Sequence, residues 1–240
     1  MAFDPDWQKF IEQQMNMDYM KELKTFVDGR RGESRVFPEP SQIFYPLSCI
    51  PYDKVLVVIL GQDPYPTAGH AHGLAFSSLS NATPYALKNI FDEIFNDVFE
   101  GNTGGINVFH HNNLTQWAQQ GVLLWNCIAT VEENAPLSHA GRGWEEFSKA
   151  MIQYLDMRPQ KLVFMLWGAE ARKYKQYIDS TRHLVLESDH PNAPRHKATA
   201  WFGNKHFSKA NNFIKKNYFN TRPAINWSVQ RDPTHVIPFI

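Results

Sequence analysis

Four short apolar runs constrain the fold of this chain more than any other feature of its sequence. The runs are rich in leucine and β-branched residues and do not alternate with polar residues, which is typical of strands buried on both faces of a parallel sheet. Each run ends in polar or small residues. The predicted strands cover residues 54–60, 122–126, 161–167 and 183–187.

Helical patterns separate these strands. Apolar residues at steps of three and four predict helices over 85–99, 143–154, 169–178 and 207–216, and a helical region over 6–27 that is closed by Asp28-Gly29. Strands that alternate with helices predict an α/β fold, a three-layer α/β/α sandwich around a central four-stranded parallel twisted sheet. No repeat or linker interrupts the chain, so we expect a single domain over residues 1–240.

The composition excludes several classes of protein. A hydrophobic content of 43% can bury a sizeable core, which excludes disordered and fibrous chains, and no apolar run is long enough to span a membrane. The N-terminus carries no signal or transit pattern. Cys49 and Cys127 form neither a disulfide framework nor a CxxC pair, which indicates a reducing compartment. We expect a cytoplasmic protein, or a nuclear one in a eukaryotic or viral setting.

The charge is unevenly distributed along the chain. The formal net charge is zero, yet residues 190–231 hold eight Lys and Arg and no Asp or Glu. The rest of the chain therefore holds 24 − 8 = 16 basic residues against 24 acidic ones. A basic segment of this kind predicts a surface that meets phosphate, and a solvated helix face is the alternative.

Polar side chains follow the four predicted strands. Ligands bind beyond the carboxyl ends of strands in open parallel sheets, so these side chains are candidates for chemistry. Together they supply one carboxylate, one imidazole, two carboxamides and one phenol. The residues are Gln62, Asp63, Tyr65, Asn126, Gly168 and His190.

Missing motifs exclude other chemistries. The chain has no GxSxG, GxxxxGK[ST], HExxH or strand-linked GxGxxG motif. His70 with His72, and His110 with His111, lack Cys, Asp or Glu partners at metal-binding spacing. We expect His72 to bond loop backbone and the other pair to lie in a polar surface loop, with no metal and no cofactor.

An ordered set of motifs resembles the uracil-DNA glycosylase family. A strand is followed by GQDPY at residues 61–65 and by AHGLAFS at 71–77, as in that family's signature. Further motifs follow in the family's order between about residues 45 and 227, which is far more specific than a lone GQDPY. They are GVLLWN at 121–126, SH at 138–139, GWE at 143–145, LWG at 166–168, HP at 190–191, FG at 202–203 and HFSK at 206–209.

The resemblance implies hydrolysis of the N-glycosidic bond of uracil flipped out of DNA, which releases free uracil and leaves an abasic site for base excision repair. The uracil anion is a good leaving group, so one carboxylate can suffice where glycosidases of O-linked sugars use two. Asp63 would act as general base and stabilise the cationic sugar. His190 would donate a hydrogen bond to uracil O2 as a neutral imidazole.

The resemblance also implies how the base is selected. Asn126 would pair with uracil N3–H and O4 and reject cytosine, which presents the opposite pattern. Phe76 would stack on the base, although a core aromatic is the alternative. Tyr65 would exclude the thymine methyl group, and Gln62 would add polar contacts near the base.

The implied partner is uracil-containing DNA, single- or double-stranded, bound by a monomer, and inhibitor proteins of this enzyme class are further candidates. The predicted DNA contacts are Pro84, Gly168, Ala169, Pro191, Asn192, Arg195 and Lys197.

The chain departs from the family pattern at three places. Pro66 stands where the family has His, Ala169 stands where it has Ser, and the leucine that enters the DNA groove is missing. Arg195 is the candidate to replace that leucine, and a phosphate contact is its alternative role.

Two other functions are compatible with the fold. One is a DNA-binding or processivity component with weak activity, which the three departures favour. The other is a mismatch glycosylase that acts on thymine, which Tyr65 argues against. A scaffold has no physical need for the complete set of catalytic and base-contacting residues, so an enzyme is the favoured prediction.

Overall fold

A central sheet of four parallel strands organises the computed structural model, which describes residues 2–192, 201–219 and 221–231. The strand order is β3-β2-β5-β6. The predicted four-stranded parallel sheet is confirmed: β3 has its predicted bounds, and the other strands begin slightly later than predicted. The strands are β2 (Val57–Gly61), β3 (Val122–Asn126), β5 (Val163–Trp167) and β6 (Leu184–Ser188).

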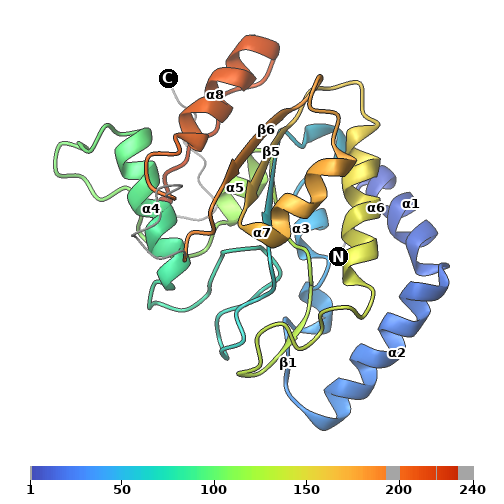
Figure 1. Ribbon diagram of the computed structural model, residues 1–240. Coiled ribbons are helices and arrows are strands. Elements are labelled where there is room, and N and C mark those ends of the chain that lie inside the picture. The colour runs from blue at the N-terminus through green and yellow to red at the C-terminus, as the bar shows by residue number, and fades with distance from the viewer. Residues whose placement is uncertain (1, 193–200, 220, 232–240) are drawn as a thin grey trace.

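Helices cover both faces of the sheet and make the three predicted layers (Figure 1). Successive residues of a strand point to opposite faces, so Val57 and Ile59 of β2 enter one hydrophobic core and Val58 and Leu60 enter the other. Two buried faces explain why the strand sequences carry no polar alternation.

The helices divide between the two cores. The first core contains residues of α4 (Tyr85–Asp97), α5 (Thr115–Gln119) and α8 (His206–Asn217). The second contains residues of α1 (Pro5–Met15), α2 (Asp18–Glu33), α3 (Tyr45–Ser48), α6 (Trp144–Asp156) and α7 (Ala169–Arg172). In the described part of the chain, no helix combines the length and apolarity needed to cross a membrane. The remaining elements are η1 (Pro40–Gln42), η2 (Tyr52–Lys54), η3 (Lys173–Tyr177) and the antiparallel pair β1 (Val36–Phe37) and β4 (Val131–Glu132).

Two helix predictions are wrong in their bounds. The region predicted over 6–27 is two helices, and α2 continues through the predicted stop at Asp28-Gly29 to Glu33. A tertiary contact outweighs the glycine there, because Arg30 in the last turn donates to the Glu132 carboxylate, 102 residues away. The helix predicted over 169–178 is the short α7 followed by the 3-10 helix η3.

The path of the chain creates a switch point next to β2. The connection through α4 and α5 leads from β2 to β3 on one side, and the connection through α6 then leads to β5 on the other side. Ligands bind at such reversals, outside the carboxyl ends of the strands. The fold therefore predicts a site at the carboxyl edge of the sheet, beside β2.

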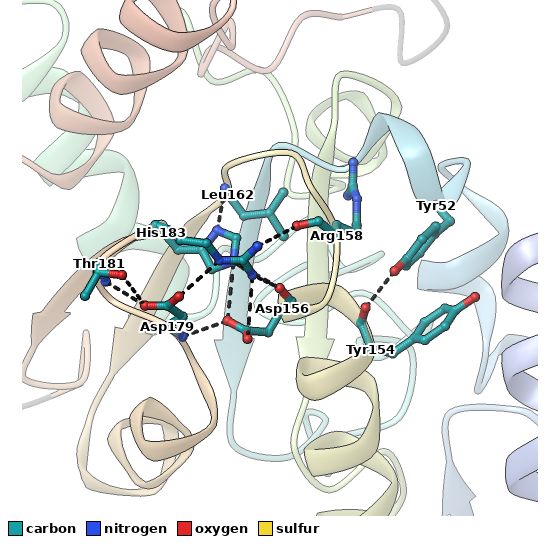
Figure 2. Close-up of polar contacts among 9 residues, drawn as sticks. Tyr52, Tyr154, Asp156, Arg158, Leu162, Asp179, Thr181 and His183 are labelled. Atoms are coloured by element: carbon teal, nitrogen blue, oxygen red, sulfur yellow. Dashed lines mark hydrogen bonds and ion pairs between the residues drawn. The ribbon is translucent and has the colours of Figure 1, made fainter.

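Polar contacts fix the opposite, amino-terminal edge of the sheet (Figure 2). The backbone N–H of Leu162 donates to Nδ1 of the buried His183 at 2.9 Å, so Nε2 carries the proton of the neutral ring. This Nε2 lies 3.3 Å from Asp156 Oδ1, which also accepts from the backbone N–H of Asp179. These groups join α6, β5 and β6, which gives His183 a structural role.

The continuation of α2 through its glycines leads to a stability prediction. A Cβ at Gly29 meets no atom within 4 Å. Alanine in a helix is favoured over glycine by about 0.5–1 kcal/mol, so Gly29→Ala should raise the free energy of unfolding by that amount in urea denaturation.

The control for this experiment is Gly143→Ala. Gly143 has a φ of +120° and a Cβ there would lie 3.2 Å from the Tyr19 carbonyl oxygen, so this variant should be destabilised. Destabilisation by Gly29→Ala would instead mean that the helix ends at Asp28.

Candidate active site

A cavity of about 340 Å³ opens at the carboxyl edge of the sheet, where the topology predicts a site. The loops after β2 and β6 and the end of β3 contribute its walls. Seven residues predicted from the sequence line it: Gln62, Asp63, Tyr65, Phe76, Asn126, His190 and Asn192. The rest of the lining is Pro64, Pro66, Ala71, Gly73, Leu74, Ser77, Ala86 and Pro136.

Asp63 holds the carboxylate of the cavity. Its Oδ2 accepts a hydrogen bond from the backbone N–H of Leu137 at 2.7 Å, and its Oδ1 accepts from the Gln62 amide at 3.2 Å. Burial raises the pKa of Asp63, and these two hydrogen bonds oppose that rise. The carboxylate is thus oriented by its neighbours and poorly solvated, which makes it a stronger base than an exposed aspartate.

His190 enters the cavity from the loop after β6. Its Nδ1 accepts from the backbone N–H of Asn192 at 3.1 Å, so the proton of the neutral ring is on Nε2. Burial lowers the pKa of His190 and favours this neutral form. Gly168, with a φ of +92°, lies beneath the ring, and a Cβ there would meet the His190 Cβ at 3.1 Å. A neutral donor is therefore held rigidly at the site.

Asn126 reaches the cavity because its neighbour across the sheet has no side chain. Gly61 of β2 pairs with Asn126 of β3, and a Cβ at Gly61 would lie 2.2 Å from Asn126 Oδ1. The carboxamide thus occupies the space over Gly61, and Asn126 is only 5% exposed. This glycine is required for close approach rather than for an unusual backbone angle.

Phe76 and Tyr65 form an aromatic wall. Phe76 has a φ of +63°, which is rare for a bulky residue, and it packs against Trp167 and His190 at ring distances of 5.4 and 5.8 Å. The Tyr65 hydroxyl donates to the Phe76 carbonyl at 3.0 Å, which stabilises that backbone. Burial raises the pKa of Tyr65. Phe76 is therefore both a packed aromatic and a face of the cavity.

Two predicted surroundings of the site are wrong in detail. His72 does not bond loop backbone: its Nε2 lies 2.6 Å from the Ser77 hydroxyl, and burial lowers the pKa of His72 to about 4. The loop at His110 and His111 is not fully at the surface, because its neighbour Asn112 is buried and bonds Thr83 and Ser80. The partner of His72 is five residues away, whereas the partners of Asn112 are 29 and 32 residues away.

Among the predicted DNA contacts that the structure describes, Ala169 and Asn192 are exposed, Pro84 is half-buried, and Gly168 and Pro191 are buried. Pro84 precedes α4, whose Ala86 lines the cavity, and Gly168 and Ala169 begin α7 beneath His190. The Pro191 carbonyl accepts from Asn89 at 2.7 Å. Asn192 lies in the lining itself. Arg195 and Lys197 lie outside the described residues.

The basic segment over 190–231, predicted to form a surface that meets phosphate, does not lie as a whole beside the cavity. Helix α8 starts near the carboxyl end of β5, where Trp167 donates to His206 at 3.0 Å. Its far end reaches the opposite edge, where Tyr218 bonds the Lys161 carbonyl and Arg222 lies 3.8 Å from Asp53. Lys215 and Lys216, in the last turn of α8, are therefore remote from the cavity.

The backbone N–H of Leu137 is the functional group that sequence reasoning missed. Almost every residue has a backbone N–H, so the residue type does not reveal which one acts as a donor. Leu137 is also 74 residues from Asp63. The neighbouring motif Ser138-His139 was the only local signal. Across the described residues, no three His, Cys, Asp or Glu side chains gather as a metal site would require.

This chain is similar to known uracil-DNA glycosylases. The family model for the uracil DNA glycosylase superfamily matches residues 50–215. The curated uracil-DNA glycosylase 2 of Bacteroides fragilis is 42% identical over 228 residues, which cover 95% of this chain and 99% of the relative.

Solved structures give the same result. The crystal structure of mimivirus uracil-DNA glycosylase has a TM-score of 0.80 and 29% identity, over 95% of this chain and 88% of that one. A mimivirus UNG variant in complex with UGI has a TM-score of 0.81 and 28% identity, over 95% and 89%. The family predicted from the sequence motifs is confirmed: this chain belongs to the uracil DNA glycosylase superfamily.

Proposed function

We propose that this chain hydrolyses the N-glycosidic bond of uracil flipped out of DNA, with the residue roles set out below. The observation that carries the proposal is one cavity that combines an oriented carboxylate, a neutral imidazole donor, a buried carboxamide and an aromatic face. The chain would thereby release free uracil and start base excision repair.

Asp63 would act on the sugar side of the bond. Departure of the base leaves positive charge on the deoxyribose, and a nearby carboxylate stabilises it and accepts a proton from the attacking water. Both roles need ionised Asp63. Because burial raises its pKa, turnover should fall as the pH drops through that raised value.

His190 would act on the base side. Negative charge develops on the departing uracil, and an Nε2–H donor directed at O2 stabilises it more in the transition state than in the ground state. The bond from Asn192 to Nδ1 holds the required tautomer. A neutral donor also releases the product anion more readily than an imidazolium would.

Selection of uracil would rest on Asn126, Tyr65 and Phe76. The buried carboxamide of Asn126 offers an acceptor to N3–H and a donor to O4, which cytosine cannot match. Tyr65 would stand against C5 of the base, and Phe76 would stack on its face. The Gln62 amide donates to Asp63 and would thereby orient this carboxylate. Gln62 would also contact the uracil ring.

We propose uracil-containing single- or double-stranded DNA as the partner, gripped by Pro84, Gly168, Ala169, Pro191 and Asn192 at the rim. Arg195 and Lys197 would extend this grip, with Arg195 either filling the vacated stack or binding phosphate.

The relatives guide the remaining proposals. A mimivirus relative is known in complex with UGI, which supports the proposal that inhibitor proteins of this kind bind here. The bacterial relative favours action in the cytoplasm. We further propose a monomer that works as one domain. The complete set of Asp63, Asn126 and His190 around one cavity argues against a DNA-binding component of weak activity.

The central prediction concerns catalysis. With EDTA present, the protein should release uracil from a single-stranded oligonucleotide, measured by alkaline cleavage at the abasic site. Asp63→Asn should lower kcat by about 100- to 10,000-fold and His190→Leu by about 100- to 1,000-fold, with smaller changes in DNA affinity.

Asp92→Asn is the matched control, because it removes an exposed carboxylate that pairs with Lys88 on α4. It should keep the wild-type rate. Equal losses of binding and turnover in the two site variants would point to a binding role instead.

A second prediction concerns the thymine methyl group. Tyr65→Ala should open space at C5 and permit slow release of thymine. Tyr65→Phe keeps the ring and loses only the bond to the Phe76 carbonyl, so it should stay specific for uracil. Thymine release by Tyr65→Phe, or none by Tyr65→Ala, would contradict the assignment.

A third prediction tests how Asn126 is placed. A Cβ at Gly61 displaces the Asn126 carboxamide, so Gly61→Ala should lower kcat/KM by about 10- to 100-fold through lost hydrogen bonds to the base. Gly32→Ala, where a Cβ meets open space, is the control and should leave kcat/KM unchanged. A wild-type kcat/KM for Gly61→Ala would show that the Asn126 carboxamide does not select uracil.

A further inference from the structure

A tight turn over residues 132–138 presents the Leu137 N–H to the catalytic carboxylate. The bond from Leu137 to Asp63 is 2.7 Å long, and the Asn134 N–H donates to the Pro66 carbonyl at 2.9 Å. The turn thus contacts the loop after β2 at two places. Its conformation decides where the Asp63 carboxylate lies.

The backbone of this turn is strained. Asn134 and Leu137 have φ angles of +58° and +63°, in the left-handed region that disfavours residues with a side chain. Leucine is bulky and cannot offset this with a local hydrogen bond of its side chain. Such conformations persist only where surrounding contacts impose them.

An ion pair from outside the turn supplies such contacts. Nε and Nη2 of Arg30 on α2 donate to Oε1 and Oε2 of Glu132 at 2.7 and 2.9 Å, and the Ser34 hydroxyl donates to Oε2 at 3.0 Å. The Glu132 side chain is only 16% exposed. Two parallel bonds fix the orientation of the carboxylate as well as its position.

Glu132 also holds both ends of the turn through its backbone. Its N–H donates to the Ser138 hydroxyl at 2.8 Å, and its carbonyl accepts from the Ala135 N–H at 3.2 Å. Ser138 is the direct neighbour of Leu137. A displacement of Glu132 is therefore transmitted to the N–H that bonds Asp63.

A buried histidine closes the other side of the carboxylate. The Thr130 hydroxyl accepts from the Trp144 indole at 2.6 Å and lies 2.7 Å from His139 Nδ1. His139 Nε2 faces Glu132 Oε1 at 3.7 Å. This fully buried ring blocks movement of Glu132 away from Arg30.

We propose that Arg30 and Glu132 are positioning residues for catalysis, holding the strained turn so that the Leu137 N–H orients Asp63. This inference rests on the proposed role of Asp63 as general base. The groups facing the Asp63 carboxylate are the Leu137 N–H and the Gln62 amide, and His190 lines the same cavity. Neither positioning residue lines the cavity.

The test compares Arg30→Gln with the wild type on a single-stranded uracil oligonucleotide. Misplacement of a reacting group by a distant change lowers kcat, so we expect a loss of about 10- to 100-fold with KM changed less than twofold. The weakened Leu137 bond no longer opposes the effect of burial on Asp63. The acidic limb of the kcat profile should therefore move to higher pH.

Three further variants sharpen the test. Arg35→Gln is the control, because it breaks the adjacent exposed pair of Arg35 and Glu133 and should keep the wild-type kcat and pH profile. If Arg30→Gln folds poorly, Glu132→Gln replaces it in the test and should show the same loss of kcat and the same shift of the pH profile. Asn134→Gly relieves backbone strain, so adding it to Arg30→Gln should restore part of the lost kcat.

Carbon NMR of the Asp63 side chain, assigned with Asp63→Asn, gives a readout that needs no activity. The pKa of Asp63 should be higher in Arg30→Gln than in the wild type. An inactive wild type would refute the proposed function and leave this comparison intact. The positioning role would be overturned if Arg30→Gln lowered only the melting temperature and left the Asp63 pKa and kcat unchanged. It would also be overturned if Arg35→Gln had the same effect as Arg30→Gln.

Discussion

The parallel pairing of β2 with both β3 and β5 is the constraint on which the structure depends. Parallel strands share one direction, so their carboxyl ends lie at the same edge of the sheet. The register sets Gly61 opposite Asn126, and Trp167 opposite Ser188. A loop of one or two residues beyond those ends is enough to bring Asp63 and His190 to one cavity.

Burial then sets the chemistry of that cavity. The same exclusion of water raises the pKa of Asp63 and lowers the pKa of His190, so each group is pushed toward its neutral form. For the histidine this is the form that the proposed mechanism requires. For the aspartate, the hydrogen bonds donated by Leu137 and Gln62 oppose the rise in pKa and favour the ionised form. The difference between the two roles therefore comes from hydrogen bonding rather than from burial.

Backbone strain is concentrated around these groups. Phe76 and Leu137 both have positive φ angles, and both backbones are held by contacts from other segments. The contact that we assign to Leu137 begins on α2, at Arg30. This residue precedes the region matched by the family model, residues 50–215. A helix that precedes the region matched by the family model is thus joined by one ion pair to the turn that contacts Asp63.

The amino-acid sequence by itself determined the strands, their parallel arrangement, the family and the side chains of the cavity, because hydrophobic periodicity and ordered motifs are local properties. Only the tertiary structure decided that α2 passes through its glycines, that α8 carries its last lysines away from the cavity, and that a leucine N–H bonds the Asp63 carboxylate. These outcomes depend on partners such as Glu132, Lys161 and Asp63 that are distant in sequence. Local propensity carries no information about such partners, since their contacts exist only once the chain has folded.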